Sequence, residues 1–143
     1  MVEYPLQFQA SAVAAGNEEV WIASAEQGGE ITVSGAEEFG GSPDGISPEE
    51  LFALSIANCI VSTFRAIAER KDLSHEAVAA DITATLDRTG EEGRPAITRA
   101  EVEVTLEGVE DRELAREIGE ITDRNCFVSR SVKTEVETSY RFS

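Results

Sequence analysis

The first 64 residues of this 143-residue chain contain neither lysine nor arginine, although ten acidic residues lie among them. The whole chain has 28 Asp and Glu residues against 12 Lys and Arg, which gives a net charge of −16 near neutral pH. Because nucleic acids are also negatively charged, a protein that binds them would need a large basic face to overcome this repulsion. The charge therefore excludes nucleic acid from the expected partners.

Long apolar runs are also lacking, since no run approaches the length of about eighteen residues that a membrane span requires. The first residues, Met1-Val2-Glu3-Tyr4, form no basic leader before an apolar stretch, so no export signal is expected. We therefore expect no membrane partner and a cytoplasmic location. Gly40-Gly41 has neither GxGxxG nor P-loop spacing, and we expect no bound cofactor.

Lysine is scarce throughout the chain, because only Lys71 and Lys133 among the 12 basic residues are lysines. An acidic surface with so little lysine indicates a protein that works at high ionic strength, where screening removes the self-repulsion of the folded state. An ordinary acidic cytosolic protein is the alternative. A melting temperature that does not rise between low and molar KCl would contradict the salt-adapted interpretation.

The chain contains no Pro/Ser-rich linker and no repeat, so we expect a single domain over residues 1–143. Short strands are expected in the N-terminal part, about residues 1–46: Leu6 to Ala14, Glu19 to Ala25 and Glu30 to Ser34, with a tight turn at Gly16-Asn17 and a loop from Gly35 to Gly45. Ser47-Pro48-Glu49-Glu50 then supplies an N-cap, a proline in the first turn and a glutamate that can bond back to the cap. These signals predict a central helix over about residues 47–71.

The predicted central helix is apolar nearly all round between Leu51 and Phe64. A helix without a polar stripe has to be covered on most sides, by a sheet on one side and by a second helix or another subunit on the other. The rest of the chain, about residues 76–143, has a β-β-α-β pattern. Its strands are expected at Val78 to Asp87, at Glu101 to Glu107 with a bulge near Ala100, and at Val132 to Phe142, with an amphipathic helix over about Asp111 to Asn125. The fold class is α+β.

Only two cysteines are present, Cys59 and Cys126, 67 positions apart. This spacing excludes a CxxC redox loop and a zinc knuckle, and the one histidine, His75, cannot complete a tetrahedral metal site with them. We therefore expect no metal. In a cytosolic protein both cysteines can simply be small buried apolar residues.

The surroundings of the two cysteines favour chemistry. Polar residues, namely Ser55, Asn58, Ser62 and Thr63, flank Cys59 in the apolar helix and indicate a shaped pocket or a close helix crossing. Arg130 follows Cys126 by four residues, and a cation placed there would favour the thiolate form of Cys126. Two such cysteines can form a peroxidatic and resolving pair, in which a sulfenic acid on one is captured by the other as a disulfide.

Two segments resemble one known family. Ser47-Pro48-Glu49-Glu50-Leu51-Phe52-Ala53-Leu54-Ser55-Ile56-Ala57-Asn58-Cys59 is similar to the Pro-Glu-(Glu/Gln)-Leu…Cys helix of the OsmC/Ohr proteins, which include osmotically inducible protein C and the organic hydroperoxide resistance proteins. Asn125-Cys126-Phe127-Val128-Ser129 resembles their second cysteine motif, usually Cys-Pro-Val-Ser. The element order and the cysteine separation also agree, so the resemblance covers essentially the whole chain.

The resemblance implies an OsmC-like fold with antiparallel sheets, a long buried central helix, a second helix and an intertwined homodimer with active sites at the interface. It also implies a thiol peroxidase that reduces organic hydroperoxides. Cys59 matches the peroxidatic cysteine, Cys126 the resolving cysteine, and Glu49 the acidic residue that orients an arginine over the reactive thiolate. A dithiol reductant, lipoyl-type in some members, restores both thiols.

This sequence departs from the family pattern at two places. The activating arginine of the family comes from the N-terminal strands, whereas no arginine precedes Arg65 here, and a replacement would have to come from Arg88, Arg99, Arg124 or Arg130. Phe127 stands where proline is usual and could alter the turn that carries Cys126. Two functions are therefore weighed: a cysteine-based peroxidase in oxidative-stress defence, and a non-peroxidase OsmC-like protein with a binding or redox-buffering role.

Overall fold

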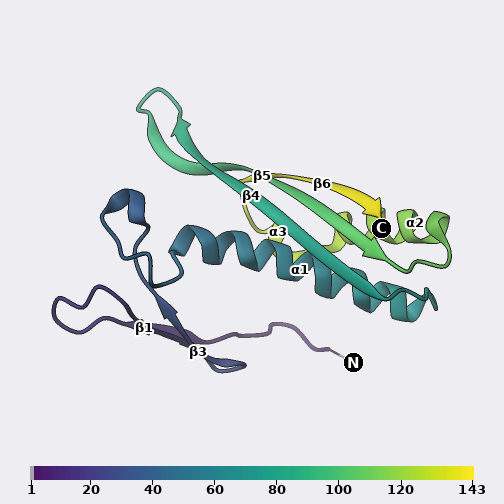
Figure 1. Cartoon of the computed structure of the whole chain (residues 1–143), viewed down its shortest axis with the longest axis horizontal. Coiled ribbons are helices and arrows are strands. Elements are labelled where there is room, and N and C mark those ends of the chain that lie inside the picture. The colour runs from purple at the N-terminus through teal and green to yellow at the C-terminus, as the bar shows by residue number, and fades with distance from the viewer. Residues whose placement is uncertain (1) are drawn as a thin grey trace. The chain divides into compact units, whose positions relative to one another are not determined.

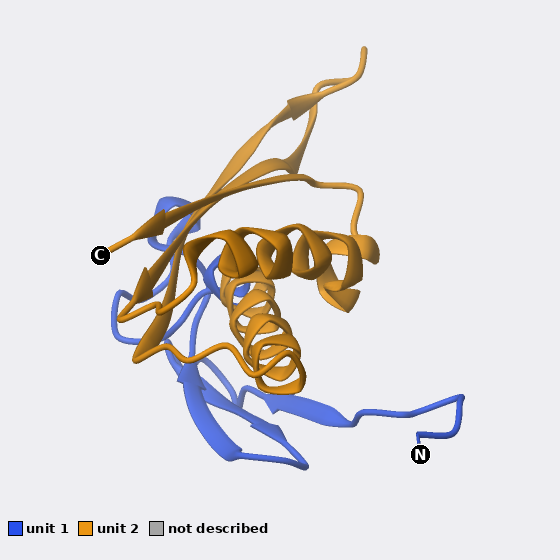
Figure 2. Cartoon of the chain, turned by 90° about the vertical axis from the view of Figure 1, so that its right-hand side faces the viewer, with its two compact units in different colours: residues 1–51 blue, residues 52–143 orange. Residues whose placement is uncertain are grey.

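The computed structural model describes residues 2–143. Met1 belongs to the predicted single domain and to its predicted N-terminal part, and it lies outside the described residues. The chain divides into two compact units, Met1–Leu51 and Phe52–Ser143 (Figure 2). Each unit is described by itself below. The single domain over residues 1–143 stays a prediction.

The first unit contains a three-stranded antiparallel sheet in the order β1-β2-β3 (Figure 1). The strands are β1 (Ala10–Val13), β2 (Trp21–Ala25) and β3 (Gly29–Val33). All three were predicted from the sequence, but β1 begins at Ala10 and not at Leu6. Ala10 pairs with Ala25, the last residue of β2, so the ladder between the two strands ends there.

The loop after β3 is held by the buried side chain of Ser34, which is 1% exposed. Its hydroxyl donates to the carbonyl oxygens of Ser42 at 2.8 Å and Gly45 at 3.1 Å. A Cβ at Gly41 would lie 1.9 Å from the carbonyl oxygen of Gly35, so only glycine fits this approach. The loop predicted from its composition is therefore ordered by its own hydrogen bonds, and it includes the short helix η1 (Glu37–Phe39).

Helix α1 (Pro48–Arg70) begins as the sequence predicted. The backbone N–H and the hydroxyl of Ser47 donate to Glu50 Oε1 at 3.1 and 2.9 Å, and the Glu50 N–H donates to Ser47 Oγ at 3.2 Å. This reciprocal pair is a capping box, which satisfies two of the free N–H groups at the helix start. The same hydrogen bonds lower the pKa of Glu50, with the backbone N–H of Ser47 making the largest contribution.

Replacing Ser47 with alanine is expected to lower the free energy of unfolding by about 1 kcal/mol, because Glu50 N–H loses its acceptor. Urea unfolding followed by circular dichroism measures this change. Glu50→Gln is the matched control, since it retains an oxygen that accepts from Ser47, and it should cost less. Because folding depresses the pKa of Glu50, its contribution is present above the ordinary glutamate pKa and is lost as the pH falls below it. A Ser47→Ala protein as stable as the wild type would contradict the capping role.

The second unit contains most of α1 and a three-stranded sheet in the order β4-β5-β6. Its further elements are β4 (Ala77–Thr89), β5 (Arg94–Glu107), α2 (Arg112–Asn125), α3 (Phe127–Arg130) and β6 (Glu135–Phe142). β4 and β5 form a long antiparallel hairpin. Its register shifts between Thr85, opposite Arg99, and Leu86, opposite Ile97, so Thr98 is the extra residue and the bulge predicted near Ala100 is present. The α+β class and the predicted element order are confirmed.

The sequence analysis predicted antiparallel sheets, and for the second sheet this is wrong in one detail. β6 runs parallel to β5, from Arg99 opposite Glu135 to Leu106 opposite Phe142, so the sheet is mixed. The reason is the connection: α2 carries the chain back along the sheet before β6 begins, and a helical crossover joins parallel strands. The alternation of apolar and polar residues along β6 is the same for a parallel and an antiparallel strand, so it does not predict the direction of β6.

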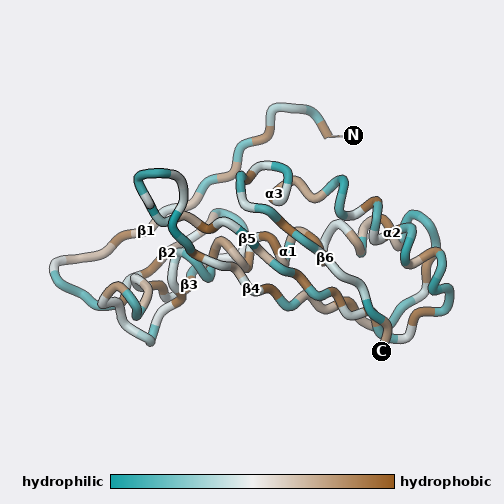
Figure 3. The backbone as a smooth tube through the Cα atoms, turned by 90° about the horizontal axis from the view of Figure 1, so that it is seen from above, coloured by the Kyte–Doolittle hydropathy of each residue, from teal (hydrophilic) through white to brown (hydrophobic). Residues whose placement is uncertain are grey.

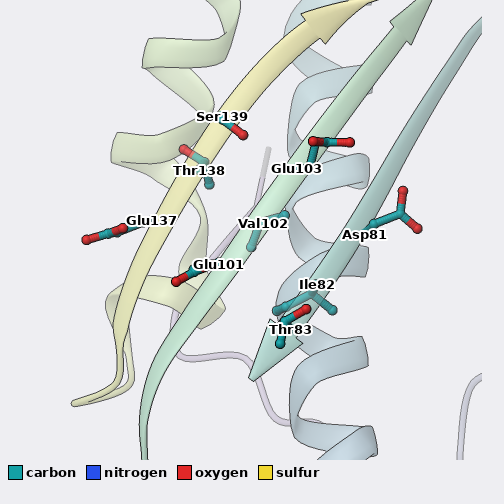
Figure 4. Close-up of a pocket in the computed structure, with 9 residues that line it drawn as sticks. All are labelled: Asp81, Ile82, Thr83, Glu101, Val102, Glu103, Glu137, Thr138 and Ser139. Carbon is teal, nitrogen blue, oxygen red and sulfur yellow. The ribbon is translucent and has the colours of Figure 1, made fainter. Parts of the chain in front are cut away.

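The core of the second unit lies between one face of the sheet and the helices. Buried residues of α1, namely Ile56, Ile60, Phe64 and Ile67, pack in one cluster with Ala100, Val102, Val104 and Leu106 of β5 and with Ala115 and Ile118 of α2. Along β5 the hydropathy alternates between residues, as expected for a strand with one buried face (Figure 3). The two helices lie on the same face of this sheet (Figure 4).

Helix α1 is only partly covered in the single chain. Leu54 is 54% exposed, whereas Ile56 and Phe64 are fully buried. By length and composition α1 could also span a membrane. The expectation that no segment is long and apolar enough for this was therefore wrong. The packing of α1 against β5 is that of a core helix. The cover expected on its other side, from a second subunit, stays a prediction.

The outer face of the second sheet is strongly acidic. Asp81, Glu101, Glu103 and Glu137 line a shallow hollow of about 530 Å³ on the side away from the helices (Figure 4). Glu101 is paired with Arg99, and Glu103 with Arg141 at 3.3 Å, but these ion pairs are exposed and contribute little to stability. Screening by salt would relieve repulsion on this face, and the salt-adapted interpretation stays a prediction.

Candidate active site

The two cysteines come from different elements of the second unit. Cys59 lies in the middle of α1, and Cys126 is the single residue between α2 and α3, where it caps both helices. The Cys126 N–H donates to the carbonyl oxygen of Thr122 at 2.9 Å, and its own carbonyl oxygen accepts from the Arg130 N–H at 3.1 Å. These backbone bonds fix the position of Cys126. Both thiols are free.

The fold brings the two thiols into one neighbourhood, because Cys126 belongs to the core cluster against which Cys59 packs. The pKa of Cys126 is raised, first by burial and then by the neighbouring Cys59 thiol, while the hydrogen bond from Ser129 lowers it. Ser129 Oγ donates to Cys126 Sγ at 3.1 Å, and Cys59 Sγ lies 3.9 Å from Thr63 Oγ1. Cys126 is 1% exposed, whereas Cys59 is partly exposed. One thiol is therefore partly open to small molecules, and the other is buried.

Replacing Ser129 with alanine is expected to raise the pKa of Cys126 further, because the hydroxyl stabilises the thiolate. Since a thiolate attacks more readily than a thiol, the reaction of Cys126 with an oxidised Cys59 should slow by about two- to tenfold near neutral pH. The pH profile of this step, followed in quenched samples by the loss of sulfenic acid that dimedone traps, should move to higher pH. Ser131→Ala is the control, because the Ser131 hydroxyl donates to the Phe127 carbonyl oxygen. An unchanged pH profile in Ser129→Ala would contradict this role.

Cys59 opens into a pocket of about 490 Å³ formed by α1, α2 and α3. The residues that line it are Cys59, Ser62, Thr63, Ala66, Ile67, Arg70, Ile121, Asn125 and Phe127. The α1 residues among them recur every three or four positions, so they form one stripe along the helix. The polar residues around Cys59 predicted a pocket or a close helix crossing, and a pocket is present, with Ser62 and Thr63 but neither Ser55 nor Asn58 in its wall.

The basic residue in this pocket is Arg70, which the sequence analysis did not consider. The four candidates named there do not line it: among residues 2–143, Arg88 bonds the Gly93 carbonyl oxygen, Arg99 pairs with Glu101, and neither Arg124 nor Arg130 contributes to the pocket wall. The signal that could have found Arg70 is its helical position, eleven residues after Cys59 and so on the same face.

Glu49 lies ten residues before Cys59 on α1, which is about 15 Å along the helix axis. The helix therefore does not bring the Glu49 carboxylate to the Cys59 sulfur. Glu49 Oε2 is nevertheless buried, and it has no hydrogen-bond partner among the described residues. Buried carboxylate oxygens normally have a partner, so this oxygen is available to a group from outside the chain.

Phe127, which stands where the resembled motif has proline, is the first residue of α3 and is 68% exposed. The first position of a helix suits proline because its N–H has no partner within the helix. A phenylalanine can occupy the same position, so the turn that carries Cys126 is formed without proline. The exchange instead adds an aromatic ring to the wall of the Cys59 pocket.

His75 is half-buried, with its ring edge against Phe64 at 6.1 Å between ring centroids. Over residues 2–143, no cluster of three or more His, Cys, Asp and Glu side chains is suited to hold a metal ion.

Comparison with known proteins gives a consistent result. The family model of the OsmC-like proteins matches residues 41–141. Among solved structures, an OsmC-like protein of unknown function from Vibrio cholerae is 18% identical with a TM-score of 0.84, covering 96% of this chain and 100% of that chain. A comparison with curated proteins gave no match.

Two further solved structures are named organic hydroperoxide resistance proteins. The one from Legionella pneumophila is 20% identical with a TM-score of 0.72, and the one from Elizabethkingia anophelis is 19% identical with a TM-score of 0.74. Each comparison covers 99% of this chain and 99% of the other. At these identities the likeness shows the fold.

Proposed function

The chain belongs to the family of OsmC-like proteins, and we propose on that basis that it is a thiol peroxidase that reduces organic hydroperoxides through Cys59 and Cys126. The family and the names of the structural neighbours support a general role in peroxide detoxification. The observation that carries the finer proposal is that a partly exposed thiol in a pocket wall has a buried thiol as its neighbour.

In the first step the Cys59 thiolate attacks the terminal oxygen of the hydroperoxide. The S–O bond forms as the O–O bond breaks, the sulfur is oxidised to sulfenic acid, and the alkoxide leaves as the alcohol after taking up a proton. Cys59 is suited to this role because it is the thiol that lines the pocket. Thr63 Oγ1, 3.9 Å from the sulfur, is a hydroxyl within reach of the reacting atoms.

In the second step the Cys126 thiolate attacks the Cys59 sulfur. The S–S bond forms, the S–O bond breaks, and hydroxide leaves as water with the proton that Cys126 gives up. Burial protects Cys126 from direct oxidation, since susceptibility follows exposure and thiolate character. The hydrogen bond from Ser129 partly offsets the effect of burial on its pKa.

A dithiol of lipoyl type is the proposed reductant. It attacks the disulfide, passes through a mixed disulfide, and leaves as its own cyclic disulfide while both cysteines return to thiols. This cycle needs a compartment in which thiols are kept reduced, which is consistent with a cytoplasmic location.

We also propose that the active form is a homodimer. The buried and unpaired Glu49 Oε2 needs a donor, and the exposed Leu54 needs cover. Because no arginine precedes Arg65, a guanidinium that pairs with Glu49 would have to come from a later segment of the chain. Glu49 is then a positioning residue, which acts on Cys59 through the group that it holds.

A second function is favoured by one specific observation. Within residues 2–143, Arg70 is the only basic residue that lines the Cys59 pocket. It lies eleven residues after Cys59 on α1, too far along the helix to be the counter-charge of the Cys59 thiolate. A thiol without such a counter-charge reacts slowly with peroxides. The alternative is therefore a redox-buffering or binding protein of the same fold.

Stopped-flow measurement of the reduced protein with cumene hydroperoxide distinguishes the two functions. A peroxidase should consume the hydroperoxide at a rate far above that of free dithiol, with turnover when dihydrolipoamide is present. A rate no higher than that of free thiol at the same pH would favour the binding or redox-buffering role.

A further inference from the structure

The Cys59 pocket differs from the rest of the chain in charge. The chain has 28 acidic residues in 143, yet none lines this pocket. The hollow on the outer face of the second sheet, by contrast, is lined by four carboxylates. An anion in the Cys59 pocket would therefore meet one guanidinium, that of Arg70, and no carboxylate.

Arg70 retains most of its hydrogen-bonding capacity. Its Nε donates to the Ala66 carbonyl oxygen at 3.3 Å, and no carboxylate among the described residues lies within ion-pair distance of it. The next residue, Lys71, does pair with Glu117 at 3.1 Å. A guanidinium has five N–H donors in a planar fork that matches a carboxylate. The terminal nitrogens of Arg70 are therefore free to bind one.

The distance between Cys59 and this cation sets the length of a suitable ligand. Ala66, whose carbonyl oxygen holds Arg70 Nε, lies seven residues after Cys59, which is about 10 Å along the axis. Helical side chains point toward the N-terminus, so the guanidinium lies over the turn that precedes Arg70. A ligand that reaches both groups thus spans roughly 10 Å.

The wall between these two groups is largely apolar. Ala66, Ile67, Ile121 and Phe127 contribute to it, and Phe127 is exposed enough to cover an alkyl chain. A hydrocarbon segment would bury apolar surface against these side chains. The pocket thus suits a molecule with a reactive head at Cys59, an apolar body and a negative tail at Arg70.

We propose that Arg70 binds a carboxylate of the substrate, so that the pocket selects hydroperoxides that carry a carboxylate roughly 10 Å from the O–O bond. This inference rests on the proposed peroxidase function and adds a specificity-determining residue to it. Arg70 acts on binding and orientation and takes no part in the transfer of oxygen.

The test compares ω-hydroperoxyoctanoate with its methyl ester, which has the same chain but no charge. At low ionic strength, kcat/KM of the wild type should be about tenfold higher for the acid, the effect of one charge-assisted hydrogen-bonded pair. In Arg70→Gln the ratio should fall toward one. Arg65→Gln, the same charge change at an exposed position of α1 outside the pocket wall, should keep the wild-type ratio. Equal ratios in the wild type and Arg70→Gln would overturn the proposal.

A binding measurement separates this inference from the proposed function. Titration calorimetry of the Cys59→Ser protein with octanoate reports on the anion site without any peroxide chemistry. Octanoate should bind about tenfold more weakly when Arg70→Gln is added, while Arg65→Gln should leave the affinity unchanged. If the wild type consumes neither hydroperoxide but Arg70 still controls octanoate binding, the peroxidase proposal fails and the anion site stands. If Arg70→Gln leaves octanoate affinity unchanged, the anion site is wrong.

Discussion

Replacing Cys59 with serine is expected to lower the rate of hydroperoxide consumption by a factor on the order of a thousand or more, to the level of buffer, because the nucleophile is lost. Cys59 is the thiol in the pocket wall, while Cys126 is 1% exposed and unable to replace it. Serine is nearly isosteric with cysteine, so the fold should be retained. Equal rates in the wild type and Cys59→Ser would contradict the assignment.

Cys126→Ser is the matched control for this variant, because it removes the other thiol and leaves the pocket intact. It should reduce one equivalent of hydroperoxide at nearly the wild-type rate and then accumulate sulfenic acid at Cys59, which dimedone traps. Turnover with a dithiol should fall, since no Cys126 sulfur is present to form the disulfide. A Cys126→Ser protein that fails even in the first equivalent would contradict the division of roles between the two cysteines.

Phe64→Ala is expected to lower the free energy of unfolding by about 3–5 kcal/mol, the range for a large aromatic residue removed from a core. Phe64 is fully buried, stacks on Tyr140 at 6.2 Å between ring centroids, and meets the edge of His75 at 6.1 Å. The variant removes the group that joins α1 to β6 in the second unit. Urea denaturation, with the midpoint and slope both fitted, measures this change.

Phe39→Ala is the control for the loss of an aromatic ring, because Phe39 is 69% exposed in η1. It should change the free energy of unfolding by less than about 0.5 kcal/mol. A Phe64→Ala protein with a loss as small as that of Phe39→Ala would show that the packing around Phe64 is not as described.

Local signals in the sequence predicted much of the fold. The Ser47-Pro48-Glu49-Glu50 segment predicted the start of α1, because a capping box depends only on neighbouring residues. Asp111 likewise caps α2, where its carboxylate accepts from the Leu114 N–H at 3.0 Å. The strands of the long hairpin followed from their alternating residues. Each of these features is determined over a few residues.

Features that depend on distant residues were not predicted. The parallel pairing of β6 with β5 depends on the path that α2 takes, and the alternation of β6 is the same for either direction. The short helix α3 has four residues, too few to show a helical period. Arg70 was not among the predicted counter-charges, which lie near Cys126 or on the β-strands, whereas the pocket follows the α1 face.

Mass spectrometry tests whether the neighbouring Cys59 and Cys126 thiols act as a peroxidatic and resolving pair. The reduced protein is treated with one equivalent of cumene hydroperoxide, alkylated, and digested without reduction. We expect one disulfide-linked peptide pair that joins Cys59 to Cys126, with a loss of two hydrogens and no sulfinic acid, and an undigested, non-reduced protein with the mass of a single chain. A Cys59 found as sulfinic acid beside an alkylated Cys126 would contradict it, as would a disulfide only between different chains.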